Sequence, residues 1–146
     1  MNPQLVLNQV NLVVRDMAAT RMFYERLGVT FKDGPSEWAA HHASAAMPEG
    51  MRLEFDSAVF AQQWNAGWRE NGAGNRAVLF FGVANREDVD RVYATTIGAG
   101  SRSQQAPTDA FWGARYAIVE DPDGNSVGLM SPMDRSKGFP PPAPPA

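Results

Sequence analysis

The side chains able to do acid–base or metal chemistry are few in this sequence. It contains no cysteine, so disulfides, thiolate metal sites and a thiol nucleophile are excluded. Its two histidines, His41 and His42, are adjacent. Because a strand sends adjacent side chains to opposite faces, at most one of them can share a face with the carboxylate of Glu54. An imidazole or a carboxylate in such a position could act as a general base.

Strand register decides which histidine lies on the face of Glu54. If the turn after Met47 pairs that residue with Met51, Ser44 lies opposite Glu54. His42 then shares the face of both residues. A shift of one residue would select the other histidine instead.

The first elements expected along the chain are a strand, a helix and three more strands. Asp16 is the predicted N-cap of the helix and Gly28 its stop signal. The expected bounds are residues 5–14 for the first strand, 17–27 for the helix, and 29–32, 38–47 and 51–56 for the other strands. This order is βαβββ.

The second part of the chain repeats the same order. The expected elements are a strand at residues 77–83, a helix at 86–97, and strands at 101–105, 115–120 and 126–130. The last two strands are joined by the turn at residues 121–125. A repeated order of elements predicts an internal duplication.

A connector and a tail complete the organisation. Val59, Phe60, Trp64 and Trp68 recur at helical spacing ahead of a glycine-rich break at residues 71–74. The segment from Ser136 onward contains too many prolines for a helix or an interior strand. We therefore expect one compact domain made of a first module (residues 1–57), a connector (58–76), a second module (77–132) and a proline-rich tail (133–146).

Composition bounds the classes of function. The chain has 146 residues, of which 44% are hydrophobic and 20% charged, as in globular proteins with a substantial core. A net charge of −3 argues against nucleic acid as a partner. No apolar stretch approaches the ~20 residues of a membrane span. Because the first residues lack the basic and apolar regions of a signal peptide, we expect a cytoplasmic location.

Three motifs in order carry a family resemblance. They are QVNLVVRD at residues 9–16, FYERLG at 23–28, and FWGARY at 111–116 leading to DPDGN at 121–125. Together they resemble the vicinal oxygen chelate superfamily, which includes glyoxalase I, bleomycin-resistance proteins and extradiol dioxygenases. The resemblance covers roughly residues 5–132. It implies an α+β fold in which two tandem βαβββ modules form an incomplete eight-stranded barrel around a concave cleft, with helices outside, usually as a homodimer.

The resemblance also implies where a metal would bind. In metal-dependent members four inward-facing side chains hold a divalent ion, and the motifs place these positions at Gln9, Glu54, Val78 and Gly128. The last two have no donor atom, whereas catalytic sites normally keep at least three protein ligands. We therefore expect no metal and no other cofactor. A set of Gln9, His42 and Glu54 stays open as an alternative metal site.

Strand periodicity assigns the remaining residues to two faces. The inner face, which mixes apolar and polar groups as small-molecule pockets do, contains Leu7, Gln9, Asn11, Val13, Arg52, Glu54, Asp56, Val78, Phe80, Ser126, Gly128 and Met130. The outer face is uniformly apolar, as a face covered by helices must be. It contains Val10, Leu12, Val14, Leu53, Phe55, Leu79, Phe81, Val83, Val127 and Leu129.

The predicted ligand-binding residues come from this inner face and from the loop at residues 111–116. They are Gln9, Asn11, Arg52, Glu54, Phe80, Phe111, Trp112, Arg115 and Tyr116. The rings of Phe111, Trp112 and Tyr116 offer stacking surfaces for a planar ligand, although Trp112 could equally anchor its own loop. Phe80 and Trp38 are weaker candidates, because the face on which each lies depends on strand registers that the sequence does not fix. Glu54 or His42 could act as a catalytic base in an enzyme, unless an arginine neutralises the carboxylate.

These observations favour a metal-independent protein that sequesters a small organic molecule, such as an aromatic compound, in the cleft between the modules. The alternative is an enzyme of the same superfamily, either a glyoxalase-like lyase or isomerase with a depleted metal site or a catalyst that depends on Glu54. An extradiol dioxygenase is least favoured because its iron needs two histidines and a carboxylate. A third hypothesis is a regulatory partner that uses the proline-rich tail for recognition.

Overall fold

A computed structural model describes residues 7, 9–64, 66, 70 and 77–143 of the chain. The chain divides into two compact units, Met1–Gly74 and Asn75–Ala146, and each is described by itself. Three sequence predictions lie outside the described residues: the start of the first strand at Leu5, the extension of the connecting helix to Trp68, and the glycine-rich break at residues 71–74.

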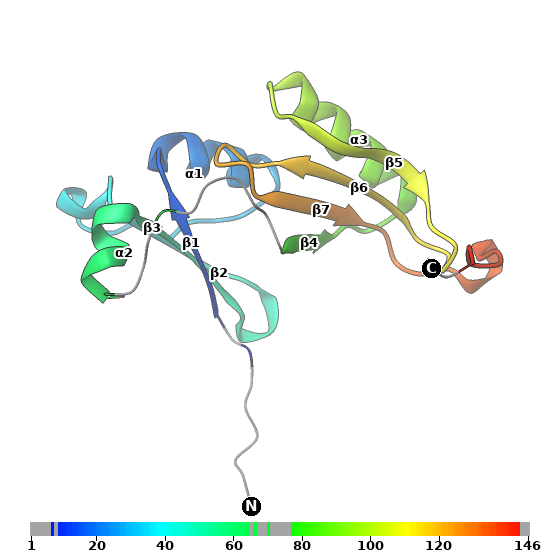
Figure 1. Ribbon diagram of the computed structural model, residues 1–146, viewed down its shortest axis with the longest axis horizontal. Coiled ribbons are helices and arrows are strands. Elements are labelled where there is room, and N and C mark those ends of the chain that lie inside the picture. The colour runs from blue at the N-terminus through cyan, green and yellow to red at the C-terminus, as the bar shows by residue number, and fades with distance from the viewer. Residues whose placement is uncertain (1–6, 8, 65, 67–69, 71–76, 144–146) are drawn as a thin grey trace, which may run out of the picture. The chain divides into compact units, whose positions relative to one another are not determined.

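The first unit is a three-stranded sheet with a helix on one face (Figure 1). The strand order is β1-β3-β2, with β1 parallel and β2 antiparallel to β3. Its elements are β1 (Gln9–Val14), α1 (Met17–Arg26), the 3₁₀ turn η1 (Ser36–Trp38), β2 (His42–Ala46), the 3₁₀ turn η2 (Pro48–Gly50), β3 (Arg52–Ser57) and α2 (Ala58–Trp64).

Helix α1 begins and ends at the predicted signals. The side chain of Asp16 accepts a hydrogen bond from the Ala19 backbone N–H at 3.0 Å, which satisfies one of the free donors of the first turn. Gly28 follows the helix at a φ of 89°, a left-handed conformation that glycine adopts at little cost. The helix therefore ends just before the predicted stop signal.

The prediction of a strand at residues 29–32 is wrong. This segment is extended, and Lys32 donates its backbone N–H to the carbonyl of Ser44 at 2.9 Å, but no strand ladder forms there. The chain turns away at once through Gly34 and Pro35, and proline has no N–H to continue the pairing. The strand expected to start at Trp38 starts at His42, because η1 occupies the residues before it.

The core of the first unit lies between α1 and the apolar face of the sheet. The ring of Tyr24 lies 4.8 Å from that of Phe55 and 4.9 Å from that of Phe23, and all three side chains are fully buried. Leu53 and Val14 extend this buried surface. Phe55, Leu53 and Val14 belong to the predicted outer face of the strands, so the predicted strand phase is confirmed here.

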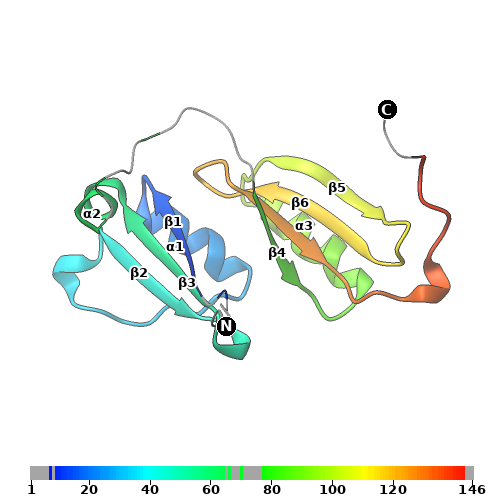
Figure 2. The same cartoon turned by 60° about the horizontal axis from the view of Figure 1, so that its bottom comes forward.

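The second unit repeats the topology with one more strand. The sheet order is β4-β7-β6-β5, with β4 and β7 parallel and the other neighbours antiparallel. The elements are β4 (Val78–Gly82), α3 (Arg86–Gly98), β5 (Ser103–Asp109), β6 (Arg115–Glu120), β7 (Ser126–Met130) and the 3₁₀ turn η3 (Arg135–Lys137). Figure 2 shows α3 behind the strands of this sheet. The βαβββ order of this unit and the α+β class of the chain are confirmed, although the described residues hold seven strands instead of eight.

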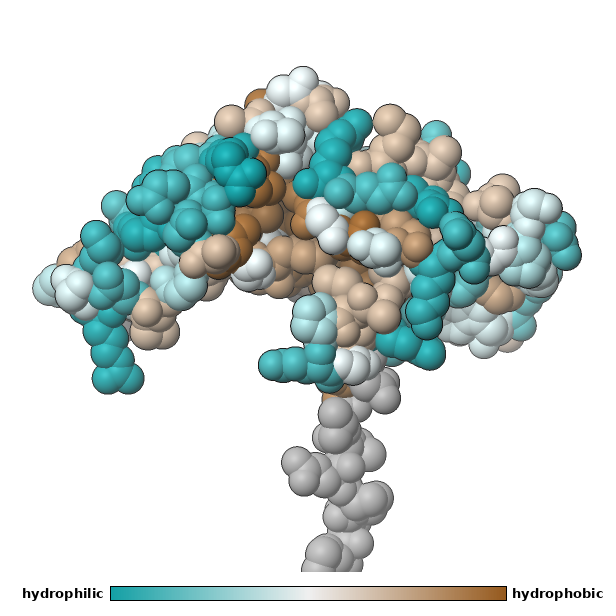
Figure 3. Space-filling view, turned by 180° about the vertical axis from the view of Figure 1, so that it is seen from behind, coloured by the Kyte–Doolittle hydropathy of each residue, from teal (hydrophilic) through white to brown (hydrophobic). Residues whose placement is uncertain are grey.

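Helix α3 covers the apolar face of the second sheet. Its N-cap is Asn85, whose side chain accepts a hydrogen bond from the Asp88 backbone N–H at 2.9 Å. Val89 faces inward and is fully buried, as are Val127 and Leu129 of β7. The opposite side of α3 is exposed and charged, and Figure 3 shows hydrophilic side chains over this unit on the left of the view.

The start of the proline-rich tail is tied to the loop before β6. Asp134 donates its backbone N–H to the carbonyl of Gly113 at 3.0 Å, and Phe139 donates to the carbonyl of Phe111 at 2.9 Å. Gly113 has a φ of 96°, and a Cβ atom added there would lie 2.1 Å from the carbonyl oxygen of Asp134. Glycine is therefore required for the tail to lie this close.

Candidate functional site

Hydrophilic side chains gather on the face of the first sheet opposite α1. The parallel register places Gln9 beside Arg52 and Asn11 beside Glu54. On the other side of β3, Ser44 lies opposite Glu54 and His42 opposite Asp56. The Met47 backbone N–H donates to the carbonyl of Met51 at 2.8 Å, so the register predicted from this turn is confirmed.

A chain of hydrogen bonds links the amides of this face to a carboxylate. Arg52 donates to the Gln9 side-chain oxygen, and Gln9 Nε2 donates to Asn11 Oδ1 at 2.7 Å. Asn11 Nδ2 in turn donates to Asp56 Oδ2 at 2.9 Å. These residues therefore orient one another.

His42 lies between two buried carboxylates. Its Nδ1 is 2.7 Å from Asp56 Oδ1, and its Nε2 is 3.5 Å from Glu54 Oε2. Glu54 is 4% exposed and Asp56 1%, so water screens this cluster poorly. His41 points elsewhere, with Nδ1 2.9 Å from Ser57 Oγ.

The two oxygens of Glu54 have different surroundings. Oε1 accepts a hydrogen bond from Ser44 Oγ at 2.9 Å and lies 3.3 Å from Arg52 Nε. Oε2 is buried and has no hydrogen-bond partner among the described residues. A buried carboxylate oxygen without a hydrogen-bond donor is costly, and the polar group that the structure places toward Oε2 is His42 Nε2, at 3.5 Å.

The residues at the family's metal positions do not fit a metal ion. Arg52 donates to the Gln9 oxygen and its Nε faces Glu54, so a guanidinium cation occupies the space beside both potential ligands. In the second unit, Val78 and Gly128 have no donor atom. Among the described residues, no group of three or more histidine or acidic side chains is arranged to hold an ion. In the alternative set of Gln9, His42 and Glu54, Arg52 engages the Gln9 oxygen, which leaves two side chains where catalytic sites normally keep three. The contact of Asp56 with His42 Nδ1 does not count against this set, because metal-binding histidines usually have such a partner on the other ring nitrogen.

A row of aromatic rings lies along one face of the second sheet and its adjoining loop. Phe80 and Tyr116 have ring centroids 6.4 Å apart, and Tyr116 stacks on Trp112 at 5.7 Å with an interplanar angle of 19°. Phe111 meets Trp112 edge-on at 5.0 Å. Phe80 and Phe111 are exposed. The structure thus brings together the four aromatic residues predicted to bind a ligand, which we name the aromatic row.

Phe80 also covers the glycine at the fourth metal position. The parallel register places Phe80 beside Gly128, and a Cβ added at Gly128 would lie 2.2 Å from the Phe80 ring. The ring fills the space that a ligand side chain would need. Phe80 and Gly128 are therefore matched to each other.

Arg115 lies apart from the aromatic row. Its guanidinium hydrogen-bonds both oxygens of Asp90 on α3 at 2.8 Å and Asp109 of β5 at 3.0 Å. The hydrogen bond from Arg115 holds the pKa of Asp90 below its usual value, and the bonds to Asp90 and Asp109 raise that of Arg115 further. Arg115 thus fastens α3 to the sheet, and neighbouring side chains of a strand, here Arg115 and Tyr116, point to opposite faces.

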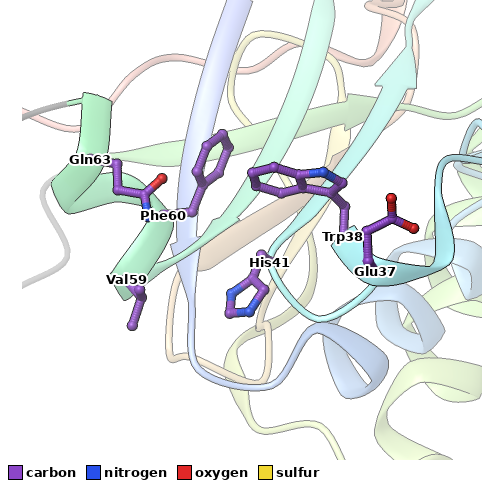
Figure 4. Close-up of a pocket in the computed structure, with 6 residues that line it drawn as sticks. All are labelled: Glu37, Trp38, His41, Val59, Phe60 and Gln63. Carbon is purple, nitrogen blue, oxygen red and sulfur yellow. The ribbon is translucent and has the colours of Figure 1, made fainter.

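Two cavities of the first unit flank a pair of rings that the sequence did not single out together. One cavity, of about 280 Å³, lies between η1 and α2 and includes His41 and Gln63 (Figure 4). The other, of about 480 Å³, lies along β2 and includes His42 and Ser44. Trp38 and Phe60 line both. They come from separate elements, so only the fold shows that they meet.

The comparisons with known proteins agree with this architecture. The Glyoxalase/Bleomycin resistance protein/Dioxygenase superfamily model matches residues 6–129, and the chain belongs to this superfamily. No curated protein matches the sequence. No helix among the described residues is long and apolar enough to cross a membrane.

Several solved structures share the fold at low sequence identity. A glyoxalase-related enzyme from Fulvimarina pelagi superposes with a TM-score of 0.75 at 19% identity, over 94% of this chain and 96% of that one. A family enzyme from Burkholderia phytofirmans gives 0.73 at 21%, over 86% and 97%. A lactoylglutathione lyase from Agrobacterium tumefaciens gives 0.64 at 16%, over 94% and 100%.

Proposed function

We propose that this chain is a metal-independent protein of the glyoxalase/bleomycin-resistance type that binds and sequesters a small organic molecule. The observation that carries the proposal is the chemistry of the four family metal positions. Two of them have no donor, and the other two are occupied by contacts with Arg52. Divalent ions need several oxygen or nitrogen ligands, which these positions do not supply.

The aromatic row supports an aromatic ligand. Exposed rings on a sheet face give a planar molecule surfaces on which to stack, and such contacts add to the free energy of burying its apolar area. Val78, which lies two residues before Phe80 on β4 and is 42% exposed, adds apolar surface to that face. A homodimer in the cytoplasm is part of the same proposal, and sedimentation of the purified protein would test the dimer.

Metal analysis and ligand stabilisation test this function in one experiment. Protein purified without chelator is expected to contain far less than one equivalent of transition metal, and added zinc, nickel, manganese or iron(II) to leave the melting temperature unchanged. A bound aromatic compound stabilises the protein, by about 2.7 kcal/mol at a hundred times its dissociation constant. We expect 2-naphthol to raise the melting temperature. Stoichiometric metal accompanied by stabilisation would contradict the proposal.

A matched pair of tryptophan variants locates the aromatic ligand. Trp112→Leu removes the centre of the aromatic row and is expected to weaken 2-naphthol binding by about threefold to tenfold, the range of an aromatic contact. Trp64→Leu removes an exposed tryptophan from α2 and should leave binding unchanged. Equal effects of the two substitutions would place the ligand elsewhere.

The arrangement around His42 favours a second candidate, an enzyme of the superfamily that works without metal. Glu54 Oε2 has no hydrogen-bond donor and faces His42 Nε2. His42 is held in turn by Asp56. A carboxylate and an oriented imidazole are the components of general acid–base catalysis in a lyase or isomerase.

Glu54→Gln separates the two functions. The amide keeps an acceptor for Ser44 and offers an N–H₂ toward His42, so we expect the fold to be retained and the stability to change by no more than ~1 kcal/mol. For a binding protein, the affinity for 2-naphthol should stay within about twofold. For an enzyme, any turnover should fall by roughly a hundredfold or more, the usual contribution of a general base. Glu49→Gln, in the exposed turn η2, is the control.

A further inference from the structure

The larger cavity of the first unit contains features that neither the metal positions nor the aromatic row explain. It holds about 480 Å³, within the range of pockets that bind small molecules. Its charged and aromatic lining residues are Arg21, Lys32, Asp33, Trp38, His42 and Phe60. They come from α1, the segment after it, η1, β2 and α2, so the cavity exists only in the folded unit.

Its aromatic wall is a cluster of three rings. Trp38 and Phe60 lie 5.1 Å apart at an interplanar angle of 63°, and the His42 ring meets Phe60 at 5.7 Å and 76°. Figure 4 shows Trp38 and Phe60 near each other, one from η1 and one from α2. Trp38 is 42% exposed, which leaves ring surface open to a guest. Such a wall favours a planar molecule.

Two cations lie on the same cavity. The Arg21 guanidinium is held over the Phe31 ring at 4.9 Å, and its Nε lies 3.7 Å from Glu25, at the edge of ion-pair distance. Lys32 is fixed beside β2 by its backbone hydrogen bond to Ser44, while its side chain is exposed.

One acid lines the cavity together with these two cations. Asp33 is the single carboxylate among the described lining residues, against Arg21 and Lys32. The lining is therefore cationic in a chain whose net charge is −3. Such a local excess of positive charge favours an anionic guest.

We propose that this cavity binds a small planar aromatic anion such as an aromatic carboxylate. The ring of the guest lies against Trp38 and Phe60, and its carboxylate is held by Arg21 and Lys32. Arginine and lysine bind carboxylates through charge-assisted hydrogen bonds, which are stronger than neutral ones. The cavity belongs to the first unit and the aromatic row to the second. The four side chains of the aromatic row are uncharged and suit neutral molecules.

Calorimetric titration of the full chain with 1-naphthoate tests the site, with 1-naphthylmethanol as the neutral analogue. We expect one saturable 1-naphthoate site, binding of the alcohol to be weaker by about tenfold, and affinity for the anion to fall as salt is raised. Arg21→Met, Lys32→Met and Trp38→Leu should each weaken 1-naphthoate by roughly threefold to tenfold. Arg26→Met, which removes the same charge from an exposed position of α1, should have no effect.

Every other outcome overturns the site. Absence of saturable binding, equal affinity for acid and alcohol, or equal affinity in Arg21→Met, Lys32→Met and Arg26→Met contradicts it. Lys32 is exposed, so Lys32→Met remains informative even if Arg21→Met disturbs α1. Loss of 1-naphthoate binding in Trp112→Leu, with the cavity variants unaffected, would show that the anion binds at the aromatic row. This result would reject the cavity site and support the proposed function.

Discussion

Phe55→Ala is expected to destabilise the first unit by about 3–5 kcal/mol, the usual cost of truncating a buried phenylalanine. The Phe55 ring is fully buried and contacts Tyr24 at 4.8 Å and Phe31 at 5.4 Å. Its loss leaves a cavity between α1 and β3 that these neighbours fill only in part. The position lies between Glu54 and Asp56 in sequence, so damage to the core also disturbs the carboxylates on the opposite face.

Differential scanning calorimetry measures this effect as a fall in melting temperature on the order of 10 °C or more for a unit of this size. Phe139→Ala is the matched control, because it makes the same chemical change at a ring that is 51% exposed. Its effect should stay within about 0.5 kcal/mol, as for ordinary surface substitutions. Equal shifts for the two variants would show that Phe55 is not part of a tightly packed core.

Gly113→Ala is expected to release the tail and to destabilise the second unit by several kcal/mol. A non-glycine residue at a φ of 96° already costs ~1–3 kcal/mol, and here the new methyl group would also meet the Asp134 carbonyl oxygen at 2.1 Å. The backbone hydrogen bond from Asp134 to Gly113 must lengthen or break to make room.

Trypsin reports the release directly, because Arg135 and Lys137 lie in η3 just beyond the contact. Cleavage at these residues should become faster in Gly113→Ala. Gly124→Ala is the control, since Gly124 has a similar φ of 84° but no atom within 4 Å of an added Cβ. It should show the backbone cost alone, with cleavage of the tail unchanged. Faster cleavage in both variants would mean that general loosening, and not the contact with Asp134, frees the tail.

Much of the fold could be predicted because side-chain alternation is a local property. Leu53 and Phe55 alternate with Glu54 and Asp56, and the structure buries the first pair against α1 and places the second on the polar face. The helix boundaries could be predicted for a similar reason. A capping side chain such as Asp16 acts on the turn that immediately follows it.

The missing strand at residues 29–32 shows where local reasoning fails. Val29 and Phe31 have strand-like composition and are buried, but a strand also needs a continuous partner, and Lys32 makes a single backbone hydrogen bond to β2. Pairing partners and loop paths are tertiary properties. The cavity beside Trp38 could not be predicted for the same reason, since it depends on the path of the loop that follows this segment.

The candidate site was only partly predictable from strand phase. Counting residues from the turn after Met47 predicts that His42, Ser44 and Glu54 share one face, and the structure confirms that register. The alternation also predicts Asp56 on this face, but it does not predict that Asp56 holds His42. Arg115 illustrates the limit, because only the fold shows that α3 presents Asp90 to its guanidinium.

The close fit of Phe80 over Gly128 makes certain evolutionary routes costly. Any residue larger than glycine at position 128 must push the Phe80 ring aside, so a histidine or glutamate there would displace this ring from its present place. A lineage that acquired a metal ligand at position 128 would disturb the first ring of its stacking surface in the same step. The effect of a substitution at either position therefore depends on the residue at the other.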